Sequence, residues 1–160
     1  METLDPHVLT HVIQSATREV FETMLGMEAA CGDPYIEQSP PPPADGVVSL
    51  IGLAGRWVGT GCLTCSGAFA CVLTTQMLMT PADTVTDEVL DVVAEITNMI
   101  LGNAKTALEE HLGPMGLSIP TVVYGKNFAA KSAGDGNWTV YPFKTDKGEI
   151  DVKIFLAPNR

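Results

Sequence analysis

Residues 86–112 form the feature that most constrains how this chain can fold, because they predict one long helix. Thr84 or Thr86, each followed by acidic residues, supplies the N-cap, and Gly113-Pro114 stops the helix at its other end. At 1.5 Å per residue the helix is about 40 Å long. It is therefore long enough to cross the whole of a domain of 160 residues.

One side of this helix carries a stripe of polar or small residues. With about 100° of rotation per residue, the stripe lies within roughly 60° of Asp91 and comprises Asp87, Glu88, Asp91, Glu95, Asn98, Gly102, Lys105, Thr106 and Glu109. The opposite side carries Val89, Val93, Ile96, Ile100, Ala104 and Ala107, which we expect to face the core. The helix is amphipathic, with one buried face and one presented face.

Glu95 and Asn98, three positions apart at the centre of the stripe, are the one pair in the sequence that suggests a catalytic or binding site. A solvated face is the simpler interpretation, but Asn98 and Gly102 both cost helix stability there, Gly102 by about 1 kcal/mol relative to Ala. An amide can orient a water molecule, and a carboxylate can pair with a Lys or Arg of another molecule. The spacing suggests a water-positioning surface for a substrate held by a partner, and phosphoryl transfer suits such a surface.

The segment over residues 91–105, followed by residues 117–125, resembles the CheX and CheC family of chemotaxis phosphatases. The family signature has an acidic residue or Ser, then Glu four positions later, Asn three after that, and Pro about twenty residues downstream. Asp91, Glu95, Asn98 and Pro120 fill these places. A single copy of the motif favours CheX over CheC.

The resemblance implies that the helix docks on a phosphorylated CheY-like receiver domain. Asn98 would position the attacking water, and Glu95 would pair with a Lys of the receiver. Asp91, Gly102 and Lys105 would belong to the partner-binding surface, with Gly102 giving clearance. The Mg²⁺ would belong to the receiver, so this chain needs no metal of its own. A non-catalytic receiver-binding module is the alternative, and the presence of both Glu95 and Asn98 favours the enzyme.

The remaining segments predict two more helices and five strands. Asp5-Pro6 reads as an N-cap with proline at the first helical position of a helix that runs to about Leu25. Ser66 caps a helix to about Met79 that is apolar on most sides and is expected to be buried. We expect strands over residues 47–53, 57–63, 121–124, 138–143 and 150–156.

The order α, β, β, α, α, β, β, β predicts an α+β fold, a layered domain with a largely antiparallel sheet packed against long helices. The first two strands form a hairpin around Ala54-Gly55-Arg56, and Asp135-Gly136 and Lys147-Gly148 supply turns. The proline run in residues 38–46 predicts a stiff connector. Sheet edges favour pairing, and the resemblance implies a homodimer with joined sheets, for which the C-terminal strands are our candidate contact.

Length and charge limit the classes of function. We expect residues 1–160 to form a single domain, in the cytoplasm, because the sequence has neither a membrane-spanning apolar run nor a signal peptide. The net charge of -10 argues against nucleic acid as a partner.

Two other groups of residues have metal-ligand spacing. Cys62 and Cys65 form a C-x-x-C, which raises the possibility of a redox or zinc site, but their odd spacing in a strand sends them to opposite faces. We therefore read them, with Cys31 and Cys71, as reduced and partly buried thiols. His7 and His11 stand at i and i+4, but no third ligand is evident, which favours a solvated helix face.

Overall fold

The computed structural model describes residues 4–37, 44–128 and 138–159. Its helical elements are α1 (Pro6–Val20), the π-helical turn η1 (Phe21–Leu25), α2 (Gly67–Leu78) and α3 (Asp87–Leu112). Its strands are β1 (Ala30–Cys31), β2 (Tyr35–Glu37), β3 (Ala44–Gly55), β4 (Trp57–Cys65), β5 (Met115–Leu117), β6 (Thr121–Phe128), β7 (Trp138–Lys144) and β8 (Glu149–Pro158). The predicted α+β fold is confirmed.

The described strands form one antiparallel sheet in the order β1-β7-β8-β4-β3-β5. Strand β6 also pairs with β3, and β2 also pairs with β7. The predicted β3–β4 hairpin is present, with Arg56 alone between the two strands. The turn around Lys147-Gly148 is present as well, whereas the predicted Asp135-Gly136 turn and Pro40 to Pro43 lie outside the described residues.

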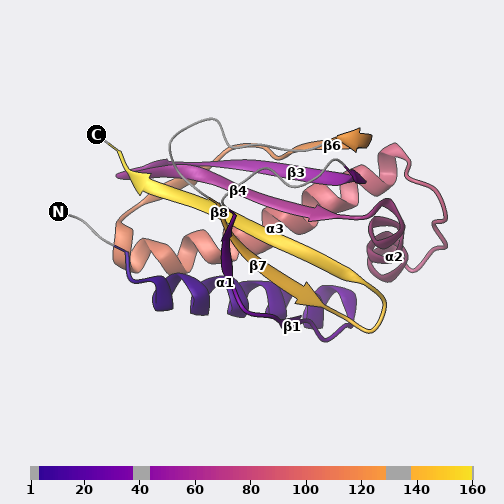
Figure 1. Cartoon of the computed structure of the whole chain (residues 1–160), viewed down its shortest axis with the longest axis horizontal. Helices are drawn as coiled ribbons and strands as arrows, with labels where there is room; N and C mark the ends of the chain where they lie inside the picture. The colour runs from indigo at the N-terminus through magenta and orange to yellow at the C-terminus, as the bar shows by residue number, and fades with distance from the viewer. Residues whose placement is uncertain (1–3, 38–43, 129–137, 160) are drawn as a thin grey trace.

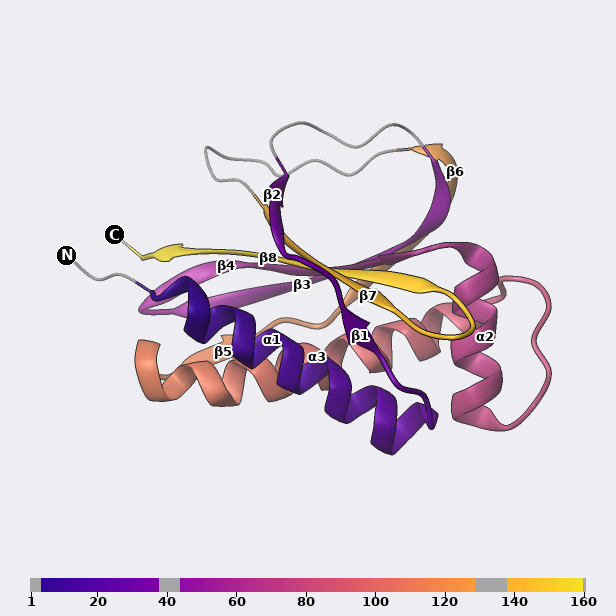
Figure 2. The ribbon, with the colours of Figure 1, turned by 60° about the horizontal axis from the view of Figure 1, so that its bottom comes forward.

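Helices α1 and α3 lie side by side against one face of the sheet, and α2 stands at one end of it (Figures 1 and 2). Large side chains fill the space between the two layers, among them Phe21, Ile51, Ile96, Tyr141 and Val152, each 1% exposed or less. Helix α3 approaches β4 closely at Gly61, where an added Cβ would lie 2.5 Å from Leu101 Cδ1. This close approach fixes the depth of α3 against the sheet.

Helix α3 has the predicted length, and its ends are capped. The Val89 N–H donates to Thr86 Oγ1 at 3.4 Å, and Gly113, at φ 82°, donates its N–H to the Glu109 carbonyl. The residues that face inward are Val89, Val92, Val93, Ile96, Thr97, Ile100, Leu101, Ala104, Leu108 and Leu112. Ala107, predicted to be buried, is exposed.

The Ala107 prediction was wrong because the buried stripe turns around α3 along its length. Measured from Asp91 at about 100° per residue, Val89 and Ile96 lie near 140–160°, whereas Leu108 and Leu112 lie near 260–300°. Near its N-terminus α3 packs on α2 through Val89 and Val93, and farther along it packs in the main core. The buried face of α3 therefore does not stay at one angle around the helix, because the elements that pack against it change along its length.

Two other expected elements differ in detail from the structure. The first helix reaches Leu25 as predicted, but it closes with a π-helical turn. Helix α2 is capped by Ser66 Oγ, which accepts from the Phe69 N–H, but it is not buried all round. Leu78 at its end is 40% exposed and the following Met79, in the left-handed region, is 83% exposed. Its outer face meets solvent because it packs at the end of the sheet.

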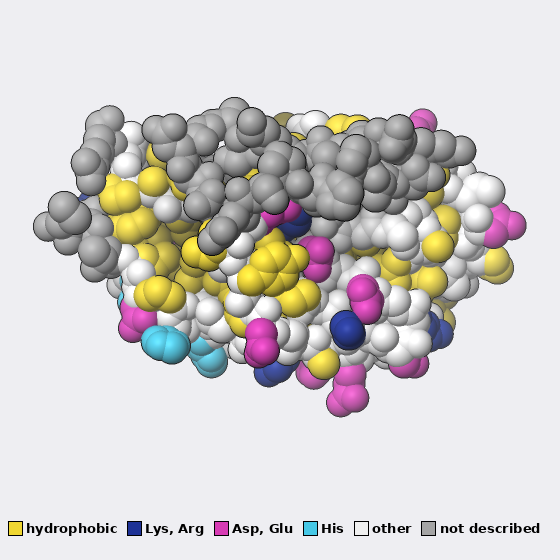
Figure 3. All heavy atoms as spheres, in the orientation of Figure 1, with side chains coloured by type: hydrophobic (Ala, Val, Ile, Leu, Met, Phe, Trp, Pro, Cys, Tyr) yellow, Lys and Arg dark blue, Asp and Glu magenta, His cyan; other side chains and the backbone are white. Residues whose placement is uncertain are grey.

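The C-terminal strands, our candidate for the dimer contact, do not form the edges of the sheet. Strand β8 lies between β7 and β4, and the other side of β7 pairs with β1 and β2, so the C-terminal strands are largely internal. Among the described residues, 155–158 of β8 have register partners on β4 alone. Hydrophobic side chains gather around this end of β8 and the start of α1 (Figure 3), where a groove of about 600 Å³ includes Leu9, Tyr35, Ile36 and Phe155.

None of the described helices combines the length and the apolar character that crossing a membrane would require.

Candidate functional site

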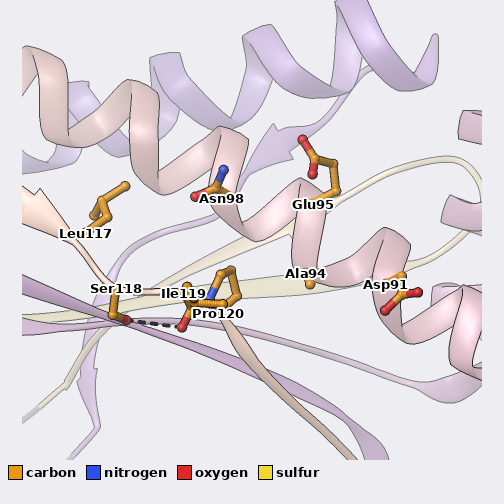
Figure 4. Close-up of a pocket in the computed structure, with 8 residues that line it drawn as sticks. All are labelled: Asp91, Ala94, Glu95, Asn98, Leu117, Ser118, Ile119 and Pro120. Atoms are coloured by element: carbon orange, nitrogen blue, oxygen red, sulfur yellow. Dashed lines mark hydrogen bonds between the residues drawn. The ribbon is translucent and has the colours of Figure 1, made fainter.

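Glu95 and Asn98 project from the middle of α3 on its exposed side, one turn apart (Figure 4). Asp91 lies one turn before Glu95 and is exposed too. Within the part of the chain that the structure describes, neither Glu95 nor Asn98 has a hydrogen-bond or ion-pair partner. A free carboxylate and a free carboxamide therefore face outward side by side, as the spacing predicts.

A second wall faces this part of α3. It is formed by Leu117, the last residue of β5, and by the connector between β5 and β6, with Ser118, Ile119 and Pro120 (Figure 4). The two walls enclose an open cleft of about 270 Å³ that is also lined by Asp91, Ala94, Glu95 and Asn98. The structure thus brings Pro120, about twenty residues downstream in the sequence, to the same cleft as Asp91, Glu95 and Asn98.

Hydrogen bonds hold the connector to the sheet. The Gly52 N–H donates to Ser118 Oγ at 2.8 Å, and the Ser118 N–H donates to the Gly52 carbonyl at 3.0 Å. Ser118 Oγ in turn donates to the Ile119 carbonyl at 3.2 Å. The hydroxyl is thus used as both donor and acceptor, so Ser118 serves to shape the wall and has no free proton to offer a ligand.

Thr97, between Glu95 and Asn98 in the sequence, points the opposite way and anchors α3 to β3. Its Oγ1 lies 2.7 Å from the Val93 carbonyl oxygen and 2.7 Å from Ser49 Oγ, and both hydroxyl-bearing residues are fully buried. Because a hydroxyl has one proton, Thr97 can donate to Val93 and accept from Ser49. This bond fixes the rotation of α3 at the point where it presents Glu95 and Asn98.

Gly102 and Lys105 lie one to two turns beyond the cleft and do not line it. A Cβ added to Gly102 would meet only Leu117 Cδ1, at 3.8 Å, so the surface there is open. Lys105 Nζ forms an ion pair with Glu109 Oε1 at 3.3 Å, and Glu109 Oε2 accepts from the Met115 N–H. That backbone N–H, and then Lys105, hold the pKa of Glu109 below its usual value. Lys105 thus takes part in joining α3 to β5.

The residues that sequence reasoning missed are Ala94, Leu117, Ser118 and Ile119. Ile119 is 88% exposed, the largest exposed fraction among the large hydrophobic side chains described. One signal that could have identified it is an apolar residue placed directly before Pro120 in a connector, where burial is not expected.

The chemistry of the cleft is that of positioning. Its side chains include two carboxylates, one carboxamide and the Ser118 hydroxyl, which is already hydrogen-bonded within the protein. No Lys, Arg, His or Cys of the described chain lines it. Two carboxylates without a cation repel a free phosphate ion. The described side chains that line the cleft thus offer no positive charge to a phosphoryl group.

The cysteines do not offer a second reactive centre. Burial raises the pKa of the Cys62 and Cys65 thiols to about 12, so both are protonated at neutral pH. Only Cys65 of the two packs against the hydrophobic core between sheet and helices. His7 and His11 are exposed on α1, and the described residues contain no cluster of three or more potential metal ligands.

A family model described as "Chemotaxis phosphatase CheX" matches residues 47–144, more than half of the chain, including the whole of α3 and the connector. The chain belongs to the CheX family. This agrees with the resemblance carried by Asp91, Glu95, Asn98 and Pro120.

Solved structures similar to this CheX-family chain include a CheC-like superfamily protein from Shewanella sp. PV-4, 26% identical, with TM-score 0.86 over 96% of this chain and 99% of that one. A chemotaxis protein CheX from Desulfovibrio desulfuricans is 27% identical, with TM-score 0.84 over 93% and 99%. CheX of the CheX–CheY–BeF3–Mg complex from Borrelia burgdorferi, 22% identical over 92% and 97% with TM-score 0.80, shares the fold. No curated protein matches the chain.

Proposed function

We propose that this protein is a phosphatase that hydrolyses the aspartyl phosphate of a CheY-like receiver domain. The observation that carries the proposal is the exposed, unpartnered pair Glu95 and Asn98 in a cleft that also holds Asp91 and Pro120. The family of the chain supports the reaction class. The complex of the Borrelia burgdorferi protein with CheY, BeF3 and Mg supports the choice of partner.

In the proposed reaction Asn98 holds a water molecule in line with the bond between phosphorus and the aspartyl oxygen. The amide oxygen accepts a hydrogen bond from the water, and the amide N–H donates to the water or to a phosphoryl oxygen. Water attacks phosphorus, the bond to the aspartyl oxygen breaks, and inorganic phosphate leaves with the water's proton released to phosphate or solvent. Catalysis is positioning and electrostatics, so this chain need not supply a nucleophile.

Glu95 anchors the receiver in this scheme. Its carboxylate accepts from a Lys of the receiver, which supplies the cation that the cleft lacks. The Mg²⁺ of the reaction belongs to the receiver, beside the phosphorylated aspartate. Asp91, Gly102 and Lys105 belong to the surrounding contact surface. Lys105 contacts the receiver while it stays paired with Glu109.

The test is the loss of labelled phosphate from receivers of the same organism, with the parent protein and with Asn98→Ala and Glu95→Ala. We expect Asn98→Ala to lower kcat about 10²-fold or more, as the loss of one positioned donor does in other enzymes. Glu95→Ala is expected to raise KM at least about tenfold, because the receiver lysine then loses its partner.

The same helix provides matched controls. Asn103→Ala and Glu110→Ala make the same changes at exposed positions of α3 outside the cleft, and both are expected to keep parental activity. Full activity in Asn98→Ala would show that the water-positioning role is wrong. A parent protein that binds an activated receiver without hydrolysing its phosphate would support the alternative, a receiver-binding module.

We also propose that the chain forms one domain and works as a homodimer. The apolar groove beside residues 155–158 of β8, where Tyr35 and Ile36 are exposed, supports a contact between two copies there.

A further inference from the structure

Ile119 is a large apolar side chain with almost no protein around it. Its exposed fraction of 88% compares with 5% or less for the isoleucines at 13, 51, 96, 100, 150 and 154. Figure 4 places it on the connector wall opposite the part of α3 that carries Glu95 and Asn98. An isolated exposed isoleucine is not unusual on a protein surface, so its exposure alone assigns it no role.

The connector holds Ile119 in place. On one side Ser118 makes three hydrogen bonds, two with Gly52 and one with the Ile119 carbonyl. On the other side Pro120 has a fixed φ and confines Ile119 itself to extended conformations. The backbone that carries this side chain is therefore ordered before any partner binds, which lowers the entropy that docking costs.

We infer that Ile119 is a docking residue of the phosphatase, buried against an apolar patch of the receiver beside its phosphorylated aspartate. Ile119 lines the same cleft as Glu95 and Asn98, so a receiver that brings its phosphoryl group to Asn98 also covers Ile119. The inference rests on the proposed function and adds a contact that the family signature residues do not include.

The charges of the site explain why an apolar contact is needed there. The protein has a net charge of -10, and exposed Asp87, Glu88, Asp91 and Glu95 all lie on the same stretch of α3. A phosphoryl group brings further negative charge, so long-range attraction contributes little to the encounter. Burial of an apolar side chain is indifferent to that repulsion and supplies affinity next to the reacting group.

The test compares Ile119→Ala, Ile119→Asp and Ile119→Leu in the dephosphorylation of the receiver that the parent protein accepts. We expect Ile119→Ala to raise KM about tenfold and to leave kcat within about twofold of the parental value. The reason is that burying an isoleucine side chain strengthens binding by somewhat more than about tenfold. Ile119→Asp should raise KM further, whereas Ile119→Leu should restore it to within about threefold of the parent. Binding of the beryllofluoride-activated receiver should weaken in parallel.

Met79→Asp is the matched control, because Met79 is 83% exposed, lies outside the cleft and has a left-handed backbone that Asp tolerates. We expect it to leave KM unchanged. All variants should keep the parental melting temperature, because they alter exposed side chains.

The outcomes separate this inference from the proposed function. A parental KM in Ile119→Asp, beside an impaired Asn98→Ala, would overturn the docking role and leave the phosphatase in place. A parent protein that binds the activated receiver without hydrolysis would overturn the phosphatase, and the binding assay would still decide the role of Ile119. A parent that neither binds nor dephosphorylates a receiver would overturn both.

Discussion

At the scale of single residues, a buried hydroxyl pair holds the part of α3 that carries the two exposed side chains of the site. Thr97 stands between Glu95 and Asn98 in the sequence and bonds to Ser49 on β3, with both side chains fully buried. A helix held by apolar contacts alone can rotate by small amounts as side chains repack. The hydrogen bond between Thr97 and Ser49 is directional, so it fixes the rotation of α3 about its axis at the turn that carries Glu95 and Asn98.

Thr97→Val tests this anchor, because valine keeps the volume of threonine and removes only the hydroxyl. We expect the free energy of unfolding to fall by about 1–3 kcal/mol, since Ser49 Oγ is left buried with a lost partner. Urea denaturation measures the change. Thr106→Val is the control: Thr106 Oγ1 makes the same bond to the carbonyl four residues back, at 3.0 Å, but it is exposed, so its change should stay within about 0.5 kcal/mol. Equal losses in the two variants would show that the contact with Ser49 contributes nothing.

The sequence could predict the α3 half of the site because the helix repeat alone decides which side chains lie together. Glu95, Asn98 and Asp91 lie on one exposed face for that reason. Ser118 and Ile119 reach the same cleft only through the pairing of β5 and β6 with β3. No local spacing encodes that arrangement, and Pro120 was placed with the site only because a family resemblance pointed to it.

At the scale of elements, the length of each helix or strand decided whether the sequence could predict it. The long helix and the five strands that carry clear apolar patterns are present where expected. Strands β1, β2 and β5 were missed, because elements of two or three residues contain no periodicity to detect. Ala107 was misplaced for a different reason, the turning of the buried stripe around α3 as its neighbours change.

Two glycines test how α3 is seated: Gly61 of β4 lies against Leu101, and Gly102 follows Leu101 in α3 itself. A Cβ at Gly61 would stand 2.5 Å from Leu101 Cδ1, so Gly61→Ala should destabilise the protein by about 1–3 kcal/mol through overpacking. A Cβ at Gly102 would have 3.8 Å to its nearest neighbour, so Gly102→Ala should stabilise the helix by up to about 1 kcal/mol. Thermal unfolding of the two variants measures both changes.

The same Gly102→Ala variant addresses the clearance proposed for the receiver. If the receiver's surface approaches the α3 backbone at Gly102, the variant should be more stable and yet show a raised KM in dephosphorylation. A parental KM would show that the glycine gives no clearance. A loss of stability would contradict the open surface seen around this position.

At the scale of the whole molecule, the sheet has one face against α1 and α3. One of its edges is formed by the short strands β1 and β2, and the other by β5 together with the eight-residue β6. Strands as short as β1, β2 and β5 limit pairing with other chains, whereas β6 is longer. Residues 155–158 of β8 lie beside an apolar groove in which Tyr35 and Ile36 are exposed. A second copy of the chain would cover this apolar surface.

Light scattering after size-exclusion chromatography tests the dimer at tens of micromolar protein. We expect a mass of about twice the 17.0 kDa of one chain. Ile36→Asp places a charge in the groove at a side chain that is 54% exposed, so it should shift the protein toward monomer and weaken the dimer about tenfold or more. Ile119→Asp makes the same substitution at a position outside this groove and should leave the mass unchanged. A monomer for the parent protein would rule out the dimer at this concentration, and a dimer that Ile36→Asp leaves intact would place the contact elsewhere on the surface.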